Sequence, residues 1–255
     1  MAALGGCGAH PMKRVYLHTF GCKANQYDTE LVGQALADHG IELVDDPATA
    51  DAAVVNSCTV TGVSEAKMRG LVRRLARHNS SIGTVVMGCA AALDDGTIAR
   101  LPNVVAVVGG SDTSAVLSAL GVSADRDRMS LRSFASSSRA WLKIQDGCDE
   151  HCTFCATRLA RGSSRSRASA DILAEAEALG ERHSEVVLTG VHIGSYGKDL
   201  GSNGARLSSL VERLVGHVPR VRIRLTSIEA TEVDQRLAEL MSGAPDNVAP
   251  HLHAP

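Results

Sequence analysis

The chain has 255 residues, of which 44% are hydrophobic and 21% charged, as in a folded globular protein with one large or two medium domains. Its net charge of −2 excludes a protein that is basic throughout, so any contact with nucleic acid must be local. No apolar run reaches the roughly 18 residues that a membrane-spanning helix needs, and the start is too weakly apolar for a signal peptide. We therefore expect no membrane contact and a cytoplasmic location, where thiols stay reduced.

Short apolar runs alternate with helical stretches through the first half of the chain. This alternation predicts an open parallel α/β sheet in an N-terminal domain over residues 12–121. Ser64 is expected to cap the helix that begins there. The expected strands cover residues 14–20, 52–57, 83–88 and 103–110, and the expected helices cover residues 26–40, 64–78, 93–100 and 113–121.

A polar stretch rich in Ser and Arg follows, and we interpret residues 122–139 as a linker. A second series of strands and helices fills residues 140–255, and residues 248–255 have the pattern of an incomplete fourth strand. A complete (β/α)8 barrel takes about 250 residues, so we expect a partial barrel in a chain truncated at its C-terminus. Its expected strands are 140–145, 185–190 and 221–227, and its expected helices are 169–183, 207–217 and 231–243.

Three cysteines follow three of the expected strands in the N-terminal domain. Cys22, Cys58 and Cys89 each come just after a strand, and Gly21 and Gly88 precede two of them. Because open α/β sheets place ligands at the carboxyl ends of their strands, we expect these thiols to share one ligand. The alternative is that each is a small buried core residue, as free cysteines often are.

A second group of cysteines has the spacing C-x3-C-x2-C after the first strand of the second domain. Cys148, Cys152 and Cys155 supply three thiolates, which suit an iron–sulfur cluster or zinc. Only three protein ligands would leave one metal position open for a small molecule, as catalytic metal sites do. The alternative is a structural zinc site completed by His151 or another histidine.

Ordered motifs across the chain resemble one family. The C-x3-C-x2-C spacing with Phe154 before its last cysteine resembles the radical S-adenosylmethionine superfamily. The whole set is similar to the methylthiotransferases of that superfamily, from about Met12 to the last residue. The motifs are TFGCKANQYDTE, VVNSCTVT, VMGCAA, IQDGCDEHCTFC, RGSSRSR, LTGVHIGSYGKDLG and LTSIEATEVD.

The resemblance implies two [4Fe–4S] clusters and S-adenosyl-L-methionine as cofactors. At the cluster held by Cys148, Cys152 and Cys155, the amino and carboxylate groups of the cofactor would chelate the open iron, and an electron from the reduced cluster would cleave the cofactor to a 5′-deoxyadenosyl radical. An auxiliary cluster at the other three cysteines would offer its open iron to the inserted sulfur. A second cofactor molecule would supply the methyl group. An electron donor and a sulfur source, both unidentified, are implied as partners.

The motifs within the family indicate the substrate. LTGVHIGSYGKDLG and RGSSRSR resemble the branch that methylthiolates carbon 2 of N6-threonylcarbamoyladenosine beside the tRNA anticodon. The alternatives are the same chemistry on isopentenyl-adenosine in tRNA or on a ribosomal protein, and a catalytically inactive fragment that binds iron–sulfur clusters or zinc.

Further residues are candidates for a role at the second cysteine group. Phe154, Gly190, Ser227 and Glu229 are candidates for binding S-adenosylmethionine, although Gly190 could equally be a turn glycine. Cys7 is interpreted as part of a leader without function. Arg158, Arg161, Arg165 and Arg167 are candidate contacts to RNA phosphate or a solvated basic loop, and a solvated helix face is expected for Arg69, Arg73, Arg74 and Arg77.

Overall fold

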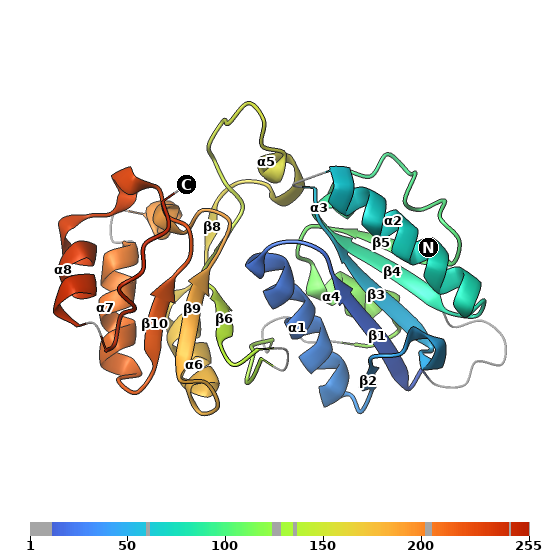
Figure 1. Cartoon of the computed structure of the whole chain (residues 1–255), viewed down its shortest axis with the longest axis horizontal. Coiled ribbons are helices and arrows are strands. Elements are labelled where there is room, and N and C mark those ends of the chain that lie inside the picture. Colours follow the sequence, from blue (N-terminus) through green and yellow to red (C-terminus); the bar gives the residue numbers. More distant parts are fainter. Residues whose placement is uncertain are drawn as a thin grey trace. The chain divides into compact units, whose positions relative to one another are not determined.

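The computed structural model describes residues 12–59, 62–123, 129–134, 137–201, 206–244 and 246–254, so Cys7 lies outside the described residues. The chain forms two compact units, shown in Figure 1. The first unit extends to Met129 and also contains His151–Arg161, and the second contains Ser130–Glu150 and Gly162–Pro255. Each unit is described by itself below.

The first unit is built on a parallel five-stranded sheet with the strand order β2-β1-β3-β4-β5. Apart from a register shift between β4 and β5, the strands pair in continuous register. The strands are β1 (Arg14–Thr19), β2 (Glu42–Val44), β3 (Ala52–Ser57), β4 (Gly83–Gly88) and β5 (Val104–Gly109), and the helices are α1 (Lys23–Asp38), η1 (Pro47–Thr49), α2 (Gly62–His78), α3 (Cys89–Ala92), α4 (Thr113–Ala119) and α5 (Thr157–Arg161).

Two apolar layers hold this sheet. Every residue of β3 and β4 is buried, which explains why these strands are continuous apolar runs rather than alternating ones. Leu36 of α1 and Leu117 of α4 pack against one face of the sheet. Met68 and Leu75 of α2 pack against the other face. The central strands therefore lie between helices, as a doubly covered parallel sheet requires.

Three local expectations for the first unit are corrected. Helix α1 begins at Lys23, three residues before the expected start, and Cys22 occupies its N-cap position. Ser64 is not a cap, because α2 already begins at Gly62. The helix expected over residues 93–100 is wrong: α3 covers Cys89–Ala92 immediately after β4, and Asp94 caps the following turn by accepting hydrogen bonds from the backbone of Ile98 and Ala99.

The second unit contains a parallel three-stranded sheet with the order β10-β9-β6 and an antiparallel pair, β7-β8. Residues near the C-terminus add to the free side of β10, because Val248 and His253 form parallel bridges with Ile223 and Ser227. The edge of β10 is therefore partly paired. The elements are β6 (Ala140–Lys143), β7 (Gln145–Asp146), β8 (Arg165–Ser166), α6 (Ser169–Gly180), β9 (Glu185–Thr189), η3 (Ile193–Ser195), η4 (Lys198–Leu200), α7 (Leu207–His217), β10 (Arg222–Leu225), η5 (Ala230–Glu232) and α8 (Gln235–Gly243).

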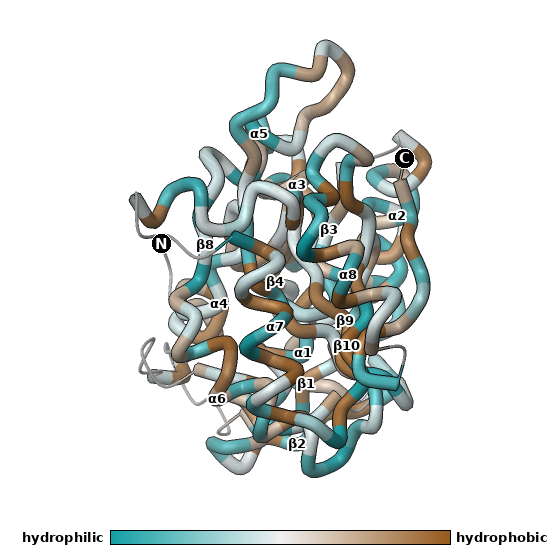
Figure 2. Tube along the Cα trace, turned by 90° about the vertical axis from the view of Figure 1, so that its left-hand side faces the viewer, coloured by the Kyte–Doolittle hydropathy of each residue, from teal (hydrophilic) through white to brown (hydrophobic). Residues whose placement is uncertain are grey.

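The expected fold class is confirmed by these elements. A parallel α/β sheet at the N-terminus precedes strands that alternate with helices, and Figure 2 shows brown hydrophobic segments beside β9 and β10. Among the described residues, no helix combines the length and the apolar character that a membrane crossing would need.

Part of the segment interpreted as a linker packs into the second unit. Leu131 and Phe134 are buried, and the Phe134 ring stands edge-on to Trp141 with 5.8 Å between ring centroids. The backbone N–H of Phe134 donates to Nε2 of His183 at 3.0 Å. The apolar side chains inside this polar stretch thus fix it to the unit that follows.

Phe134→Ala should destabilise the second unit by about 3–5 kcal/mol, because it removes a buried ring and leaves a cavity. The test is urea unfolding followed by the fluorescence of Trp141, the single tryptophan of the chain. Phe154→Ala is the matched control, because Phe154 is 91% exposed and its loss should change stability by less than about 0.5 kcal/mol. Equal effects of the two substitutions would contradict the packing of Phe134.

Candidate functional site

The structure places Cys22, Cys58 and Cys89 at the carboxyl edge of the first sheet, as expected. Cys22 lies between β1 and α1, Cys58 directly follows β3, and Cys89 directly follows β4 and begins α3. Cys58 and Cys89 are buried, whereas Cys22 is exposed. We refer to these three residues as the rim triad.

Glycines directly before Cys22 and Cys89 allow the backbone to turn sharply at the rim triad. Gly21 has a φ of 121°, and a Cβ there would stand 3.1 Å from the Sγ of Cys58. Gly88 has a φ of 97°, and a Cβ there would overlap the side-chain oxygen of Asn56 and the backbone of Ser57. Only glycine tolerates both the left-handed backbone and the close approach at these positions.

A buried amide, that of Asn25, lies beside the rim triad. The Nδ2 group of Asn25 donates to Oδ1 of Asn56 at 2.7 Å and to the carbonyl of Ser57 at 2.9 Å. These two acceptors fix the orientation of the amide, so its Oδ1 faces Cys22 and Arg161. That oxygen accepts hydrogen bonds from the thiol of Cys22 at 3.3 Å and from a guanidinium nitrogen of Arg161 at 3.0 Å.

The pKa of the Cys89 thiol responds to its burial and to its charged neighbours. Burial raises the pKa of the Cys89 thiol, while the charge of Arg161 and a hydrogen bond from its Nε at 3.3 Å act in the opposite direction. The nearby thiols of Cys22 and Cys58 raise this pKa further. The thiols of Cys22 and Cys58 therefore lie near that of Cys89.

Within the described ranges, no three His, Cys, Asp or Glu side chains converge as ligands of a single metal ion. In a [4Fe–4S] cluster each thiolate binds a different iron, so the ligands stand further apart than around one ion. Soft thiol donors on one sheet edge suit such a cluster.

The second cysteine group is divided between the two units. Cys148 belongs to the second unit and is half-buried, and its backbone N–H donates to the carbonyl of Gly162 at 3.0 Å. Cys152 and Cys155 belong to the first unit and are exposed, and Cys155 Sγ lies 3.1 Å from the hydroxyl of Thr157. The thiols at positions 152 and 155 are therefore accessible to a ligand.

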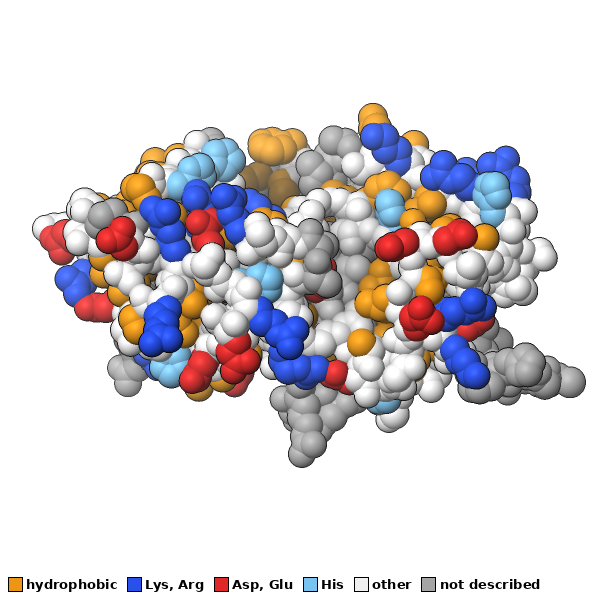
Figure 3. All heavy atoms as spheres, turned by 60° about the horizontal axis from the view of Figure 1, so that its bottom comes forward, with side chains coloured by type: hydrophobic (Ala, Val, Ile, Leu, Met, Phe, Trp, Pro, Cys, Tyr) orange, Lys and Arg blue, Asp and Glu red, His pale blue; other side chains and the backbone are white. Residues whose placement is uncertain are grey.

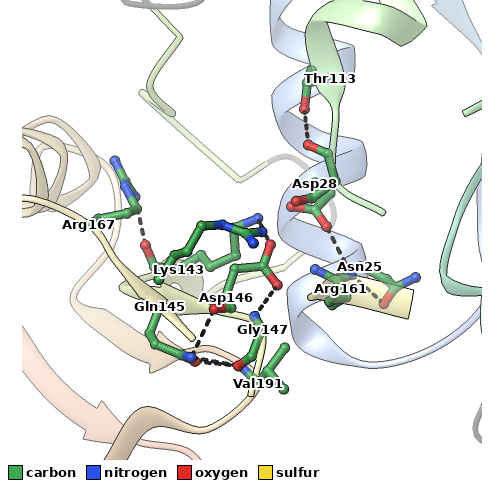
Figure 4. Close-up of polar contacts among 12 residues, drawn as sticks. Asn25, Asp28, Thr113, Lys143, Gln145, Asp146, Gly147, Arg161, Arg167 and Val191 are labelled. Carbon is green, nitrogen blue, oxygen red and sulfur yellow. Dashed lines mark hydrogen bonds and ion pairs between the residues drawn. The ribbon is translucent and has the colours of Figure 1, made fainter. Parts of the chain in front are cut away.

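A second buried amide organises the turn that precedes Cys148 (Figure 4). The Nε2 group of Gln145 donates to the carbonyls of Asp146 and Gly147 at 2.9 and 2.6 Å. Its Oε1 accepts from the backbone N–H groups of Val191 at 3.1 Å and His192 at 2.9 Å. One side chain thus joins the loop after β6 to the loop after β9.

His192 and Glu232 form a polar pair that the motifs alone did not single out. Nδ1 of His192 lies 3.8 Å from Cys148 Sγ, and its Nε2 lies 3.0 Å from Oε2 of Glu232. Lys198 approaches the other oxygen of Glu232 at 3.2 Å. The side chain at position 192 therefore connects a predicted cluster ligand to a carboxylate at the end of η5.

A cavity of about 510 Å³ opens at this carboxylate. It lies beyond the carboxyl ends of β9 and β10, the face on which barrel enzymes carry their active sites. The residues that give it polar and charged walls are Tyr196, Lys198, Arg206, Thr231, Glu232 and Asp234. Its volume is within the range of small-molecule sites.

The four candidate cofactor-binding residues lie outside the described lining of this cavity. Phe154 is exposed. Packing explains why position 190 is a glycine, because a Cβ there would stand 2.8 Å from the carbonyl oxygen of Gln145. The hydroxyl of Ser227 lies 2.7 Å from Nδ1 of His253, and Glu229 is exposed at the start of η5. Their role in binding S-adenosylmethionine stays a prediction.

The arginines after Cys155 differ from one another in the structure. Arg161 is buried, so the expectation that it contacts RNA phosphate or solvent is wrong. Arg167 bonds to Glu175 at 2.6 Å and to the carbonyl of Lys143. Arg158 and Arg165 are exposed and stay candidates for RNA contact.

Among the described residues, basic and acidic side chains are mingled on the face shown in Figure 3. On α2, Arg69 forms an ion pair with Glu65 and a hydrogen bond to Thr97. Such a pair is typical of a solvated helix face.

Two families match consecutive parts of the chain. Uncharacterized protein family UPF0004 matches residues 14–110, and the Radical SAM superfamily matches residues 142–255. The chain is 36% identical over 96% of its length to the threonylcarbamoyladenosine tRNA methylthiotransferase MtaB of Bacillus subtilis, covering 57% of that protein. It is 32% identical over 95% of its length to MtaB of Thermotoga maritima, covering 58%. It is also 32% identical over 96% of its length to the tRNA-2-methylthio-N(6)-dimethylallyladenosine synthase of Acidithiobacillus ferrooxidans, covering 59%.

The cysteine spacing, the strand-end site and these matches define a radical S-adenosylmethionine protein. More particularly, the chain belongs to the radical S-adenosylmethionine methylthiotransferase family and is MtaB-like. It spans a little under three fifths of the length of these relatives. Membership implies S-adenosylmethionine and an iron–sulfur cluster as cofactors, and the soft thiol donors described above fit the cluster.

Gly88→Ala should disrupt the rim triad. The residue would carry a strained left-handed backbone, which costs about 1–3 kcal/mol, in addition to the clash with Asn56 and Ser57. Hydrogen exchange of the β3 and β4 amides measures the loss of stability. Gly70→Ala in α2 is the control, because the added Cβ would meet open space. This substitution should stabilise the fold by about 0.4–1 kcal/mol. Slow exchange retained in Gly88→Ala would refute the role given to this glycine.

Proposed function

We propose that the protein containing this chain methylthiolates N6-threonylcarbamoyladenosine in tRNA, at carbon 2 of its adenine. The observation that carries the proposal is the rim triad, because three thiols from distant parts of the sequence share one sheet edge in a radical S-adenosylmethionine protein. Transfer of sulfur together with methyl needs a sulfur-binding metal site besides the radical site. The similarity to two MtaB proteins supports the threonylcarbamoyl-modified substrate.

Two [4Fe–4S] clusters would serve this reaction. Cys148, Cys152 and Cys155 would hold the first, and the rim triad Cys22, Cys58 and Cys89 would hold the auxiliary one. When bound, the first cluster and S-adenosylmethionine supply the 5′-deoxyadenosyl radical, and the auxiliary cluster supplies the iron for the incoming sulfur. Gln145 would hold the turn before Cys148 in place through its bonds to Gly147 and His192.

The cavity beside Glu232 is proposed as part of the small-molecule site of the second unit. Lys198 and Arg206 supply positive charge, and Glu232 and Asp234 supply negative charge and acceptors. This mixed lining suits a ligand with a carboxylate and hydrogen-bonding groups, such as the amino-acid part of S-adenosylmethionine or the carboxylate and hydroxyl of a threonylcarbamoyl group. Phe154, Gly190, Ser227 and Glu229 are kept as further candidates for contact with the cofactor.

The proposal implies partners outside the chain. A reductant must supply the electron for radical formation, and a sulfur source must replenish what is transferred. A tRNA substrate and reduced thiolates would place the reaction in the cytoplasm. Arg158 and Arg165 are the exposed candidates for phosphate contact near the second cysteine group.

A second candidate substrate is isopentenyl-adenosine in tRNA. It is favoured by the 32% identity to the relative from Acidithiobacillus ferrooxidans, whose name describes a 2-methylthio-dimethylallyladenosine synthase acting on tRNA. A ribosomal-protein substrate is a third candidate, and an inactive fragment that only binds clusters is a fourth. Measurements of iron content and of modified nucleosides separate these four functions.

The anaerobically reconstituted chain should bind about eight irons with matching sulfide, four in each cluster. Cys148→Ala and Cys58→Ala should each remove about half of the iron, because each leaves one cluster with two thiolates. Cys7→Ala is the matched control and should retain all of it. Iron and sulfide analysis measures the content, and stoichiometric zinc in place of iron would overturn the assignment.

Cells whose gene carries Cys58→Ala should lose the 2-methylthio form of N6-threonylcarbamoyladenosine and accumulate the form without it. Mass spectrometry of digested tRNA measures both nucleosides, and cells with Cys7→Ala are the control. A loss confined to 2-methylthio-isopentenyl-adenosine would favour the second substrate. Unchanged tRNA nucleosides would leave the ribosomal protein, to be checked by peptide mass spectrometry, or the inactive fragment.

A further inference from the structure

Arg161 is a buried cation at the rim triad. It ends α5, six residues after Cys155, and its side chain is 1% exposed. An arginine is rarely buried unless its charge is paired, because moving the guanidinium out of water costs free energy that a partner must offset. The contacts of Arg161 therefore indicate what the side chain does.

The contacts of the guanidinium include three bonds to described residues, two of them visible in Figure 4. One terminal nitrogen lies 3.1 Å from Oδ2 of Asp28 and 3.0 Å from Oδ1 of Asn25, both on α1. The Nε group donates to Cys89 Sγ at 3.3 Å. Asp28 is likewise 1% exposed, so the ion pair is shielded from solvent on both sides.

We propose that Arg161 is a positioning residue that donates a hydrogen bond to the Cys89 ligand and, balanced by Asp28, sets the reduction potential of the auxiliary cluster. This inference rests on the proposed cluster at Cys22, Cys58 and Cys89. It concerns the residues behind the ligands, which act on the cluster through Cys89.

The sign of each effect follows from charge. A cluster held by three thiolates becomes more negative when it gains an electron. A nearby guanidinium that donates to a ligand sulfur stabilises the reduced form and raises the potential, whereas a nearby carboxylate lowers it. Arg161 and Asp28 therefore act in opposite directions, and low local polarity strengthens both effects.

The test is a redox titration of the auxiliary cluster followed by electron paramagnetic resonance. The full chain carries Cys148→Ala, Cys152→Ala and Cys155→Ala, so that the rim triad holds the only cluster. After anaerobic reconstitution the protein is titrated with dithionite. The midpoint potential is compared with that of the same protein carrying one further substitution.

Arg161→Met should shift the midpoint to a more negative value, and Asp28→Asn should shift it to a more positive one. Arg161→Lys keeps the charge but loses the planar fork of donors, so its midpoint should lie between those of the parent and Arg161→Met. Glu175→Gln is the matched control: it removes another buried acid, paired with Arg167 in the second unit, and should leave the midpoint unchanged.

Shifts of the same sign for Arg161→Met and Asp28→Asn, or no shift in either, would overturn the inference, because general loosening of the site has no reason to give opposite signs. If Arg161→Met does not fold, the shifts of Arg161→Lys and Asp28→Asn decide in the same way. Failure of the proposed function looks different: the parent would bind no cluster, and Cys58→Ala would not change its iron content.

Discussion

The parallel pairing of β1, β3 and β4 is the constraint on which the site of the first unit depends. Because Ser57 pairs with Gly88 in register, the residues that follow, Cys58 and Cys89, leave the sheet at the same level. A slip of one residue would turn every side chain of a strand to the opposite face and bury the wrong set. The buried apolar faces of β3 and β4 thus fix the place of two thiols.

Two buried amides then hold the ends of the strands. Asn25 satisfies Asn56 and the carbonyl of Ser57 in the first unit, and Gln145 satisfies backbone groups of two loops in the second. A buried polar group that loses its partner costs about 1–3 kcal/mol, so each amide resists displacement. Because both amides are neutral, they add no net charge near the thiols. That charge comes from other residues.

The sequence was sufficient for the parallel sheet and for the position of the rim triad, because both follow from alternation along the chain and from where strands end. It was insufficient where tertiary contacts decide. The four arginines near Cys155 look equivalent as letters, yet Arg161 is buried against Asp28, 133 residues away in sequence. The helix after β4 begins at Cys89 itself, and local propensity alone favoured a later start. Phe134 lies in a polar stretch, and only its contact with Trp141 shows that the stretch is packed.

The energetics of the Arg161–Asp28 pair indicate what it contributes. Desolvation of two charges offsets most of their attraction, so a buried pair adds little net stability over apolar residues of similar volume, whereas removal of one partner costs about 3–5 kcal/mol. Net stability therefore explains the buried Arg161–Asp28 pair poorly. The position in which the pair holds the chain explains it better. The pair holds the end of segment 151–161, which carries Cys152 and Cys155, against the helix that begins beside Cys22. The buried side chain of Arg161 thus joins the segment that bears two ligands of one predicted cluster to the residues around the other.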